Sequence, residues 1–240
     1  MNYLKQIKHF LNKKCTFSEL FSNEVKALNY PLNPTQDEIR NVILGKSKVS
    51  NGEPIQAVAN YLRRGKGTSS VATDPRFLKK SEEEILKKYR KIIPISSFQN
   101  KIGQGLEHRV YLDSDKKTVT KINNGYFYSY WKNYFNSLLL NNYFFPDTAY
   151  NLIGFTEENG RIFPVVKQPY IEATEKTDLD QVRKFASHNG FKSTEDHAFN
   201  YVNEELGIKL EDLHSQNVII NNGYLYFIDT VFHIHPNLFE

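Results

Sequence analysis

The stretch DLHSQNVIINNGYLYFID, residues 212–229, decides how this chain is interpreted. It begins with Asp212, reaches Asn217 five positions later and continues into an apolar run at residues 218–220. The Asn-Asn-Gly at 221–223 predicts a tight turn, so the next strand returns and brings Asp229 beside Asn217. Carboxylate and amide oxygens are ligands that Mg²⁺ accepts, although a lone Asp or Asn is as typical of a simple turn. The stretch therefore predicts a base, Asp212, beside a metal site formed by Asn217 and Asp229.

Two further clusters lie upstream of this hairpin. In GQGLEHRV, residues 103–110, Gly103 and Gly105 allow the backbone to approach phosphate groups, and Val110 is placed to lie against a flat base. In TVTKI, residues 118–122, strand alternation aims Lys121 under that glycine-rich stretch. Each cluster alone is weak evidence for nucleotide binding, since two glycines in a turn and an exposed strand lysine are ordinary features. Their order along the chain carries the information.

This order resembles that of the protein-kinase-like fold, in which a glycine loop, a strand lysine, a D-x-x-x-x-N loop and a later Asp follow one another. The resemblance covers about residues 96–235 and implies ATP and Mg²⁺ as cofactors. It makes Asp212 the catalytic base, Lys121 a catalytic phosphate-binding residue, and Asn217 and Asp229 the metal ligands. The strand RIFPVV and the following KQPYI resemble the hinge that contacts adenine. The implied nucleotide-binding residues are Gly103, Gly105, Val110, Lys121, Gln168 and Tyr170.

A narrower resemblance rests on three segments of the sequence. NNYFFPDTAYNLIGF at 141–155, QPYIEA at 168–173 and DLHSQNVII at 212–220 are similar to a compact kinase-like family found in polyvalent proteins of phages and conjugative elements. This resemblance implies a mobile-element setting and an acceptor on a protein.

The sequence also departs from the kinase pattern. His108 stands where the third glycine is expected, and residues 122–146 contain no Asp or Glu that could pair with Lys121. Asn133, Asn136, Glu157, Glu158 or a residue of the front helices are the candidates for that role. His214 after the catalytic Asp is closer to aminoglycoside and choline kinase relatives. Residues 230–240 are too few for an activation segment and a peptide-binding helical lobe, so we expect a truncated C-lobe.

Periodicity and turn signals predict an α+β chain with helices in front. We expect a minimal two-lobed kinase-like fold at residues 96–240, preceded by a basic, helical region at 1–95 that packs on it. The predicted helices are at 4–11, 35–45, 55–65, 81–93, 128–143 and 177–190, with a linker at 63–75. The predicted hairpins join 109–113 to 117–122, 151–156 to 161–166, and 218–220 to 224–228.

Composition narrows the class of protein. The chain has 240 residues, 40% of them hydrophobic and 24% charged, which excludes a disordered chain or a coiled-coil rod. No run approaches the roughly 18 apolar residues of a membrane span, the first residues do not form a secretory signal, and Cys15 is the single cysteine. These features predict a cytoplasmic protein. Residues 1–95 hold 18 Lys and Arg against 9 Asp and Glu, a bias that allows nucleic-acid binding but favours a solvated helical surface.

The sequence thus predicts an ATP- and Mg²⁺-dependent phosphotransferase that moves the γ-phosphate to a hydroxyl acceptor. Two alternatives remain on the same fold: a nucleotide-binding pseudokinase that serves as a switch or scaffold, and an AMP transferase. The missing helix Glu favours the pseudokinase, whereas the complete set of Asp212, Asn217 and Asp229 favours the enzyme.

Overall fold

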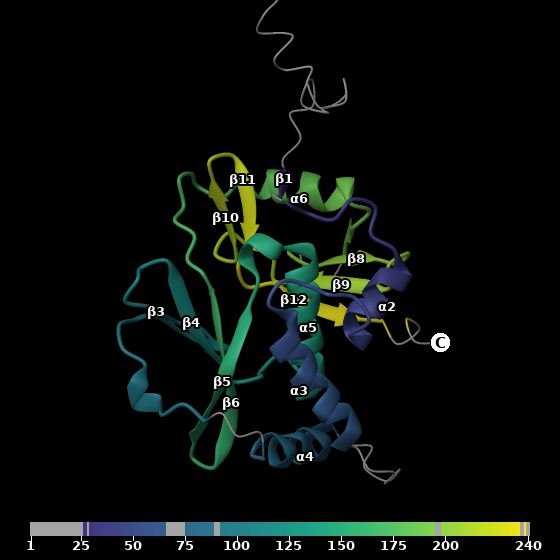
Figure 1. Ribbon diagram of the computed structural model, residues 1–240. Coiled ribbons are helices and arrows are strands. Elements are labelled where there is room, and N and C mark those ends of the chain that lie inside the picture. Colours follow the sequence, from purple (N-terminus) through teal and green to yellow (C-terminus); the bar gives the residue numbers. More distant parts are fainter. Residues whose placement is uncertain are drawn as a thin grey trace, which may run out of the picture.

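A computed structural model of the chain describes residues 26–27, 29–65, 75–88, 92–194, 198–235 and 238 (Figure 1). The helix predicted at residues 4–11, Cys15 and residues 66–74 of the predicted linker lie outside these described residues. The chain forms helices and mainly antiparallel sheets, which confirms the α+β class. The two-lobed arrangement with a truncated C-lobe, and the domain boundary near residue 95, stay predictions.

Two front helices form as their local signals predict. Helix α2, Gln36–Leu44, begins at Thr35, whose side chain and that of Glu38 cap each other's backbone N–H groups. It ends at Gly45, whose left-handed backbone (φ 74°) is the conformation that glycine adopts without strain. Helix α3, Gly52–Gly65, buries one apolar face.

Helix α4, Pro75–Leu86, corrects the predicted helix at 81–93. Pro75 occupies its first position, where a missing N–H costs nothing, and Ser81 therefore lies inside the helix instead of capping it. The helix ends at Leu86, and Ile92 forms a β-bridge with Phe155. Lys79 of α4 donates hydrogen bonds to carbonyl groups of the loop that follows the third strand of the large sheet.

The large sheet has five antiparallel strands in the order β2-β3-β4-β6-β5. After a short 3-10 turn, η1 (Ile95–Ser97), come β2 (Lys101–Gln104), β3 (His108–Leu112) and β4 (Thr118–Asn123). Strands β5 (Asn151–Glu158) and β6 (Arg161–Pro169) complete it and confirm the second predicted hairpin. The glycine-rich stretch begins within strand β2, because Gly103 pairs with Val110.

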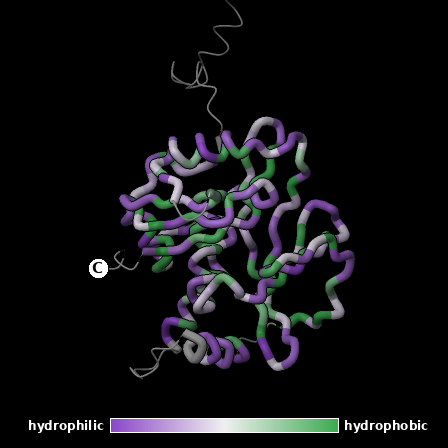
Figure 2. Tube along the Cα trace, turned by 180° about the vertical axis from the view of Figure 1, so that it is seen from behind, coloured by the Kyte–Doolittle hydropathy of each residue, from purple (hydrophilic) through white to green (hydrophobic). Residues whose placement is uncertain are grey.

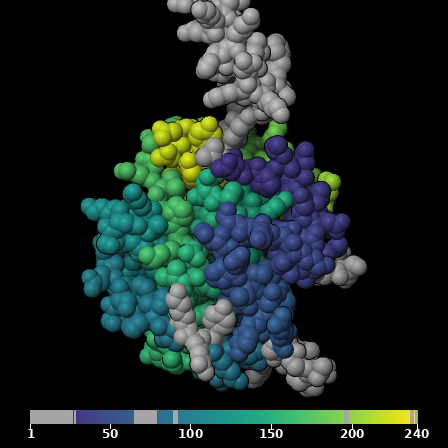
Figure 3. All heavy atoms as spheres, in the orientation of Figure 1, coloured from purple at the N-terminus to yellow at the C-terminus, as the bar shows by residue number. Residues whose placement is uncertain are grey.

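Helix α5, Trp131–Phe144, lies at the centre of the molecule (Figure 1). It contacts α2, α3, α4 and a strand of the second sheet, so that most of its residues are buried. The turn η2, Pro146–Thr148, leads from it into β5. Figure 3 shows the purple and blue atoms of α2 and α3 lying over one side of α5. A partly buried hydrogen bond joins two of these elements, since Arg63 of α3 donates to Asn136 of α5.

Two smaller sheets, of three and four strands, form besides the large one. The predicted hairpin forms as β10 (Val218–Asn221) and β11 (Tyr224–Phe227), and β1 (Lys26–Ala27) adds to β11 in parallel. Helix α6, Leu179–His188, was predicted, whereas the sheet β12-β9-β8-β7 was missed. Its strands are β7 (Lys192–Ser193), β8 (Tyr201–Asn203), β9 (Ile208–Glu211) and β12 (Val231–Ile234).

One hydrophobic core runs through these elements. At its centre, Phe145 stacks on Phe227 with ring centroids 4.2 Å apart, and Phe144 stacks on Phe232 at 5.5 Å. Figure 2 shows hydrophobic and hydrophilic segments interleaved along the chain, as expected when each helix and strand buries one face. Among the described helices, none is long and apolar enough to cross a membrane.

Candidate active site

One face of the large sheet carries four of the six predicted nucleotide-binding residues, namely Gly103, Val110, Lys121 and Gln168. Gly103 of β2 pairs with Val110 of β3, which pairs with Lys121 of β4 and then Val166 of β6. Residues directly opposite each other on neighbouring strands point to the same face, so these side chains form a row across the sheet. Neither glycine has a left-handed backbone, and a Cβ on Gly103 would stand 3.8 Å from Val110. Gly103 therefore leaves open space on this face, as a phosphate site requires.

Lys121 is buried within this row. Its Nζ donates to the carbonyl oxygen of Ile228 at 2.6 Å and lies 3.7 Å from Asp229 Oδ2. Burial lowers the pKa of Lys121, and the nearby negative charges of Asp229 and Glu107 offset part of this effect. Tyr150 donates its hydroxyl to the same Ile228 carbonyl, and the Lys121 ammonium lies 5.6 Å from the centre of the Tyr150 ring.

Asp229 connects this face to the β10–β11 hairpin. Strand β11 ends at Phe227, and the Ile228 N–H donates to Asn217 O at 2.9 Å, so the hairpin brings Asp229 back toward Asn217 as predicted. His108 Nδ1 lies 3.2 Å from Asp229 Oδ1. Burial alone would raise the pKa of Asp229, but attraction by His108 and Lys121 outweighs it, and the pKa is lowered. Asp229 is therefore held ionised.

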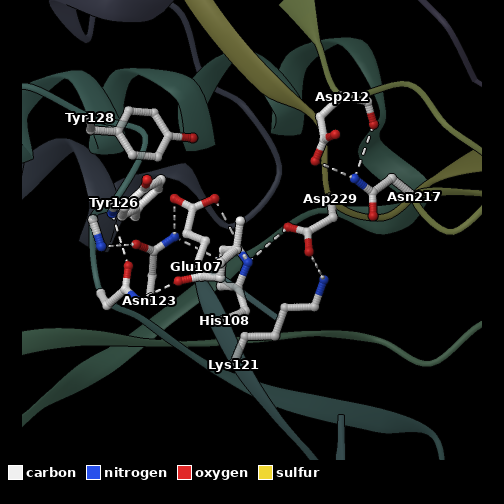
Figure 4. Close-up of polar contacts among 12 residues, drawn as sticks. Glu107, His108, Lys121, Asn123, Tyr126, Tyr128, Asp212, Asn217 and Asp229 are labelled. Atoms are coloured by element: carbon white, nitrogen blue, oxygen red, sulfur yellow. Dashed lines mark hydrogen bonds and ion pairs between the residues drawn. The ribbon is translucent and has the colours of Figure 1, made fainter. Parts of the chain in front are cut away.

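A buried network holds Glu107 and His108 against the end of β4 (Figure 4). Asn123 Oδ1 accepts from the Gly125 N–H, which turns its amide nitrogen toward Glu107 Oε1 at 2.7 Å and His108 Nε2 at 2.8 Å. His108 is thus held between Asn123 on its Nε2 side and Asp229 Oδ1 on its Nδ1 side. Burial raises the pKa of Glu107. The residue that replaces the third glycine is thus fixed in the site.

Asp212 and Asn217 contact each other directly. Asn217 Nδ2 donates to Asp212 Oδ2 at 2.7 Å and to the Asp212 carbonyl oxygen at 3.0 Å. His214 Nε2 lies 3.2 Å from the other carboxylate oxygen, Oδ1. Asp212 has a left-handed backbone (φ 69°), a conformation that Asp tolerates better than most residues. Its N–H donates to Asn200 Oδ1 at 3.1 Å, which helps to hold this geometry.

In the predicted hinge, the side chain of Gln168 and not the backbone N–H of Tyr170 is left to form a hydrogen bond with a ligand. Gln168 is buried opposite Val119, on the face that Lys121 occupies, and donates to Thr148 O at 2.7 Å. Its Oε1 is buried and has no hydrogen-bond partner among the described residues. The Tyr170 N–H already donates to Lys117 O at 2.8 Å, and its ring is 43% exposed. Of these two residues, Gln168 is therefore the one that retains a buried acceptor for a ligand.

Asn217 and Asp229 are the residues of this site that could hold a magnesium ion. No group of three or more His, Cys, Asp or Glu side chains in the described parts of the chain is placed to hold a metal. Magnesium needs only one or two protein ligands, because phosphate oxygens and water complete its shell. Asn217 Nδ2 is committed to Asp212, which leaves its Oδ1 as a ligand atom, and Asp229 supplies an ionised carboxylate.

The candidates for the missing partner of Lys121 lie elsewhere. Asn136 accepts from Arg63, Glu158 pairs with Arg109, and Glu157 is exposed. Among the described hydrogen bonds and ion pairs, none joins Lys121 to these residues or to Asn133. The carboxylates that act on Lys121 are Asp229 and Glu107. Sequence reasoning missed Glu107, although an acid next to a histidine within the glycine-rich stretch is a visible signal.

Comparison with known proteins agrees with this arrangement. No curated protein shows significant similarity to the chain. The family described as serine/threonine/tyrosine kinases found in polyvalent proteins matches residues 79–236, a range that includes most of α4 and every site residue described above. The chain belongs to this family and is therefore a kinase, a phosphotransferase of the polyvalent-protein type.

Proposed function

We propose that this kinase uses ATP and Mg²⁺ and transfers the γ-phosphate to a hydroxyl group on a protein. The observation that carries the proposal is the Lys121–Asp229 ion pair of 3.7 Å, joined through the Ile228–Asn217 hydrogen bond to the Asp212–Asn217 contact of 2.7 Å. A cation and two carboxylates buried to different degrees supply the charges that phosphoryl transfer requires. Figure 4 shows these side chains facing one another.

The residues of the sheet would bind and orient ATP. Val110 and the buried Gln168 Oε1 lie on the sheet face where a base would be held, and the Gln168 oxygen would accept a hydrogen bond from the adenine amino group. Gly103 allows phosphates to approach, and Lys121 would neutralise their charge. Burial lowers the pKa of Lys121, and the negative charge of bound phosphates would act in the opposite direction, as Asp229 and Glu107 do.

The catalytic loop would handle the acceptor. Asp212 would accept the proton of the acceptor hydroxyl while Asn217 holds its carboxylate in place. Asn217 Oδ1 and Asp229 would hold Mg²⁺, which supplies charge neutralisation at the phosphates when bound. Most of the catalysis would come from positioning and electrostatics, which explains why few residues suffice.

The test is incubation of the protein with Mg²⁺ and γ-labelled ATP, alone and with cell lysate. Asp212→Ala is the control, because it removes the proposed base without touching the phosphate-binding face. We expect label on the protein or on a lysate component with the wild type and none with the variant, while both bind ATP. Full labelling by Asp212→Ala would refute the assignment. A mass gain of one AMP would redirect the function to nucleotidyl transfer.

A pseudokinase is the second candidate, and one observation favours it. His108 occupies the position of the third glycine and contacts Asp229 at 3.2 Å, where the metal would bind. In a pseudokinase this contact would persist with nucleotide bound. ATP-dependent thermal stabilisation that is insensitive to Mg²⁺, with no transfer in any lysate, would support this candidate.

A further inference from the structure

A pocket of about 320 Å³ adjoins Asp212. We define it as the acceptor slot; its lining residues are Phe127, Phe199, Asn200, Glu211, Asp212 and Val231. We propose that the acceptor slot takes the side chain of a tyrosine in a polypeptide and that tyrosine is the residue phosphorylated. This inference rests on the phosphotransferase function proposed above.

Residues that line the acceptor slot contact the catalytic loop directly. The Leu213 N–H donates to Phe199 O at 3.0 Å, and Asn200 Oδ1 accepts from the Asp212 N–H at 3.1 Å. The Phe199 ring meets His214 edge-on, with centroids 6.1 Å apart. These contacts fix one aromatic wall relative to the catalytic carboxylate. Phe127, from the loop after β4, supplies the other wall.

The slot is aromatic rather than anionic in character. Glu211 lies within it but is already paired, with Lys209 Nζ at 2.6 Å and His233 Nε2 at 2.9 Å. Burial opposes ionisation of Glu211, yet these partners outweigh it and lower its pKa. A paired carboxylate offers little to a Lys or Arg beside the acceptor residue. Recognition therefore falls to Phe127 and Phe199, whose side chains prefer another ring in an edge or offset contact.

Geometry favours a phenol over a short aliphatic hydroxyl. The Asp212 side chain is 42% exposed, so a serine or threonine hydroxyl can also reach it, but its short side chain leaves the Phe127 and Phe199 rings without an aromatic partner from the acceptor. A tyrosine ring fills the slot and leaves its backbone outside. Its hydroxyl, with an ordinary pKa of about 10, also gives up its proton more readily than an aliphatic alcohol.

The openness of the slot favours a polypeptide over a free small phenol. Phe127 is 41% exposed and Phe199 39% exposed, so the walls cover one side chain and leave its surroundings in water. Small-molecule sites usually enclose most of their ligand within roughly 300–1,000 Å³. The acceptor slot stands at the lower end of that range and suits a single residue of a longer chain.

The transfer balances with the groups present. The phenolic proton passes to Asp212 Oδ1, which lies 3.2 Å from His214 Nε2, while Oδ2 keeps its hydrogen bond from Asn217. The phenolic oxygen forms a bond to the γ-phosphorus of ATP as the bond from that phosphorus to the ADP oxygen breaks. The products are phosphotyrosine and ADP, and Asp212 afterwards releases its proton to solvent.

The first experiment compares three degenerate peptide libraries, each with one fixed acceptor: tyrosine, serine or threonine. We expect the full chain with Mg²⁺ and ATP to phosphorylate the tyrosine library at least about tenfold faster than the others, since a phenol ring contacts both aromatic walls of the slot and a short hydroxyl side chain does not. Phe199→Ala should raise the KM for that library about tenfold and leave the KM for ATP unchanged. Tyr224→Ala, at an exposed aromatic on β11, is the matched control and should change neither. Faster serine or threonine labelling, or an unaltered KM in Phe199→Ala, would overturn the proposal.

A binding measurement separates this inference from the proposed function. N-acetyl-tyrosinamide is titrated by NMR without ATP, with N-acetyl-serinamide as the comparison and Phe199→Ala as the variant. Binding of the tyrosine probe that is lost in Phe199→Ala, in a protein that transfers no phosphate, would leave the slot assignment standing and refute the phosphotransferase. Equal or absent binding of both probes would overturn the slot assignment itself.

Discussion

Substitution of Glu82 tests whether helix α4 stabilises helix α5. The result does not depend on whether the protein transfers phosphate. The Glu82 side chain belongs to α4, is 1% exposed, and accepts hydrogen bonds from the Trp131 N–H at 2.5 Å and the Lys132 N–H at 3.3 Å. These groups begin helix α5, whose N-cap residue, Tyr130, makes no side-chain capping hydrogen bond. A carboxylate from another helix thus performs the capping and offsets the helix dipole.

The cost of removing this cap can be worked out from its parts. Losing an N-cap costs about 0.5–2 kcal/mol, and leaving a buried N–H without an acceptor costs about 1–3 kcal/mol. Because the two terms overlap, we expect Glu82→Ala to lower the free energy of unfolding by about 3 kcal/mol, which corresponds to a fall in Tm of roughly 6–12 °C at this chain length. Glu82→Gln keeps an acceptor oxygen and should lose about 1 kcal/mol.

Thermal and urea unfolding followed by circular dichroism would measure these changes. The matched control is Glu84→Ala on the same helix, because Glu84 pairs with Lys87 on the exposed surface, where solvent screens the interaction. Its melting temperature should stay close to that of the wild type. If Glu82→Ala melts no lower than Glu84→Ala, α4 does not cap α5 and the reasoning fails.

Three further predictions concern the site. Asp229→Ala should weaken binding of ATP with Mg²⁺ at least about tenfold in calorimetry, as expected for loss of a charged ligand, and unaltered affinity would count against its role. Gly103→Ala should leave Tm unchanged but raise the KM for ATP, since its Cβ would enter the phosphate face; Gly105→Ala, whose Cβ meets nothing within 4 Å, should have the smaller effect. Asn123→Leu should destabilise the fold by about 2–4 kcal/mol, because it leaves buried Glu107 without its hydrogen bond, and a wild-type Tm would contradict this.

The parts of the fold that the sequence predicted depend on neighbours in the chain. The Thr35–Glu38 capping box and Gly45 lie within eleven positions, and they locate α2 without tertiary information. The Asn-Asn-Gly turn likewise predicts β10 and β11, because its backbone requirements are local. In the same way, alternation along residues 118–122 places Lys121 on one face of β4.

The parts that the sequence did not predict depend on distant contacts or on very short elements. Strand β1 has two residues and pairs with β11, about two hundred positions away, so no local pattern reveals it. Strands β7, β8, β9 and β12 have two to four residues each, too few for a period to be recognised. The start of α4 was missed because Pro75 was assigned to the linker, although a proline is equally typical of a first helical position.

For the site, sequence order located the side chains of the motif but not what holds them. Glu107 and Asn123 lie sixteen positions apart on different strand ends, and only the pairing of β3 with β4 brings His108 opposite Asn123. The role of Glu107 follows from its burial, which a sequence does not display. The sequence did show a departure from the kinase pattern, since a Glu-His pair stands where glycine is expected. Departures of this kind concentrate at functional sites.

The absence of acids in α5 has a structural cause. Neighbouring elements bury this helix on several sides, and Glu82 of α4 caps its first turn, so an acid in its body would face apolar side chains. The negative charge near Lys121 therefore comes from the end of the glycine-rich stretch instead, where Glu107 is fixed by Asn123. Glu107 belongs to a hydrogen-bond network that also holds His108 against Asp229. This network connects the glycine-rich stretch, which would contact the phosphates, to Asp229, which would hold the metal. If Asp229 binds Mg²⁺ as proposed, we expect the ion to compete with His108 for Asp229 Oδ1, whereas in a pseudokinase the contact would persist. The position of His108 with ATP and Mg²⁺ bound would therefore distinguish the two proposed functions.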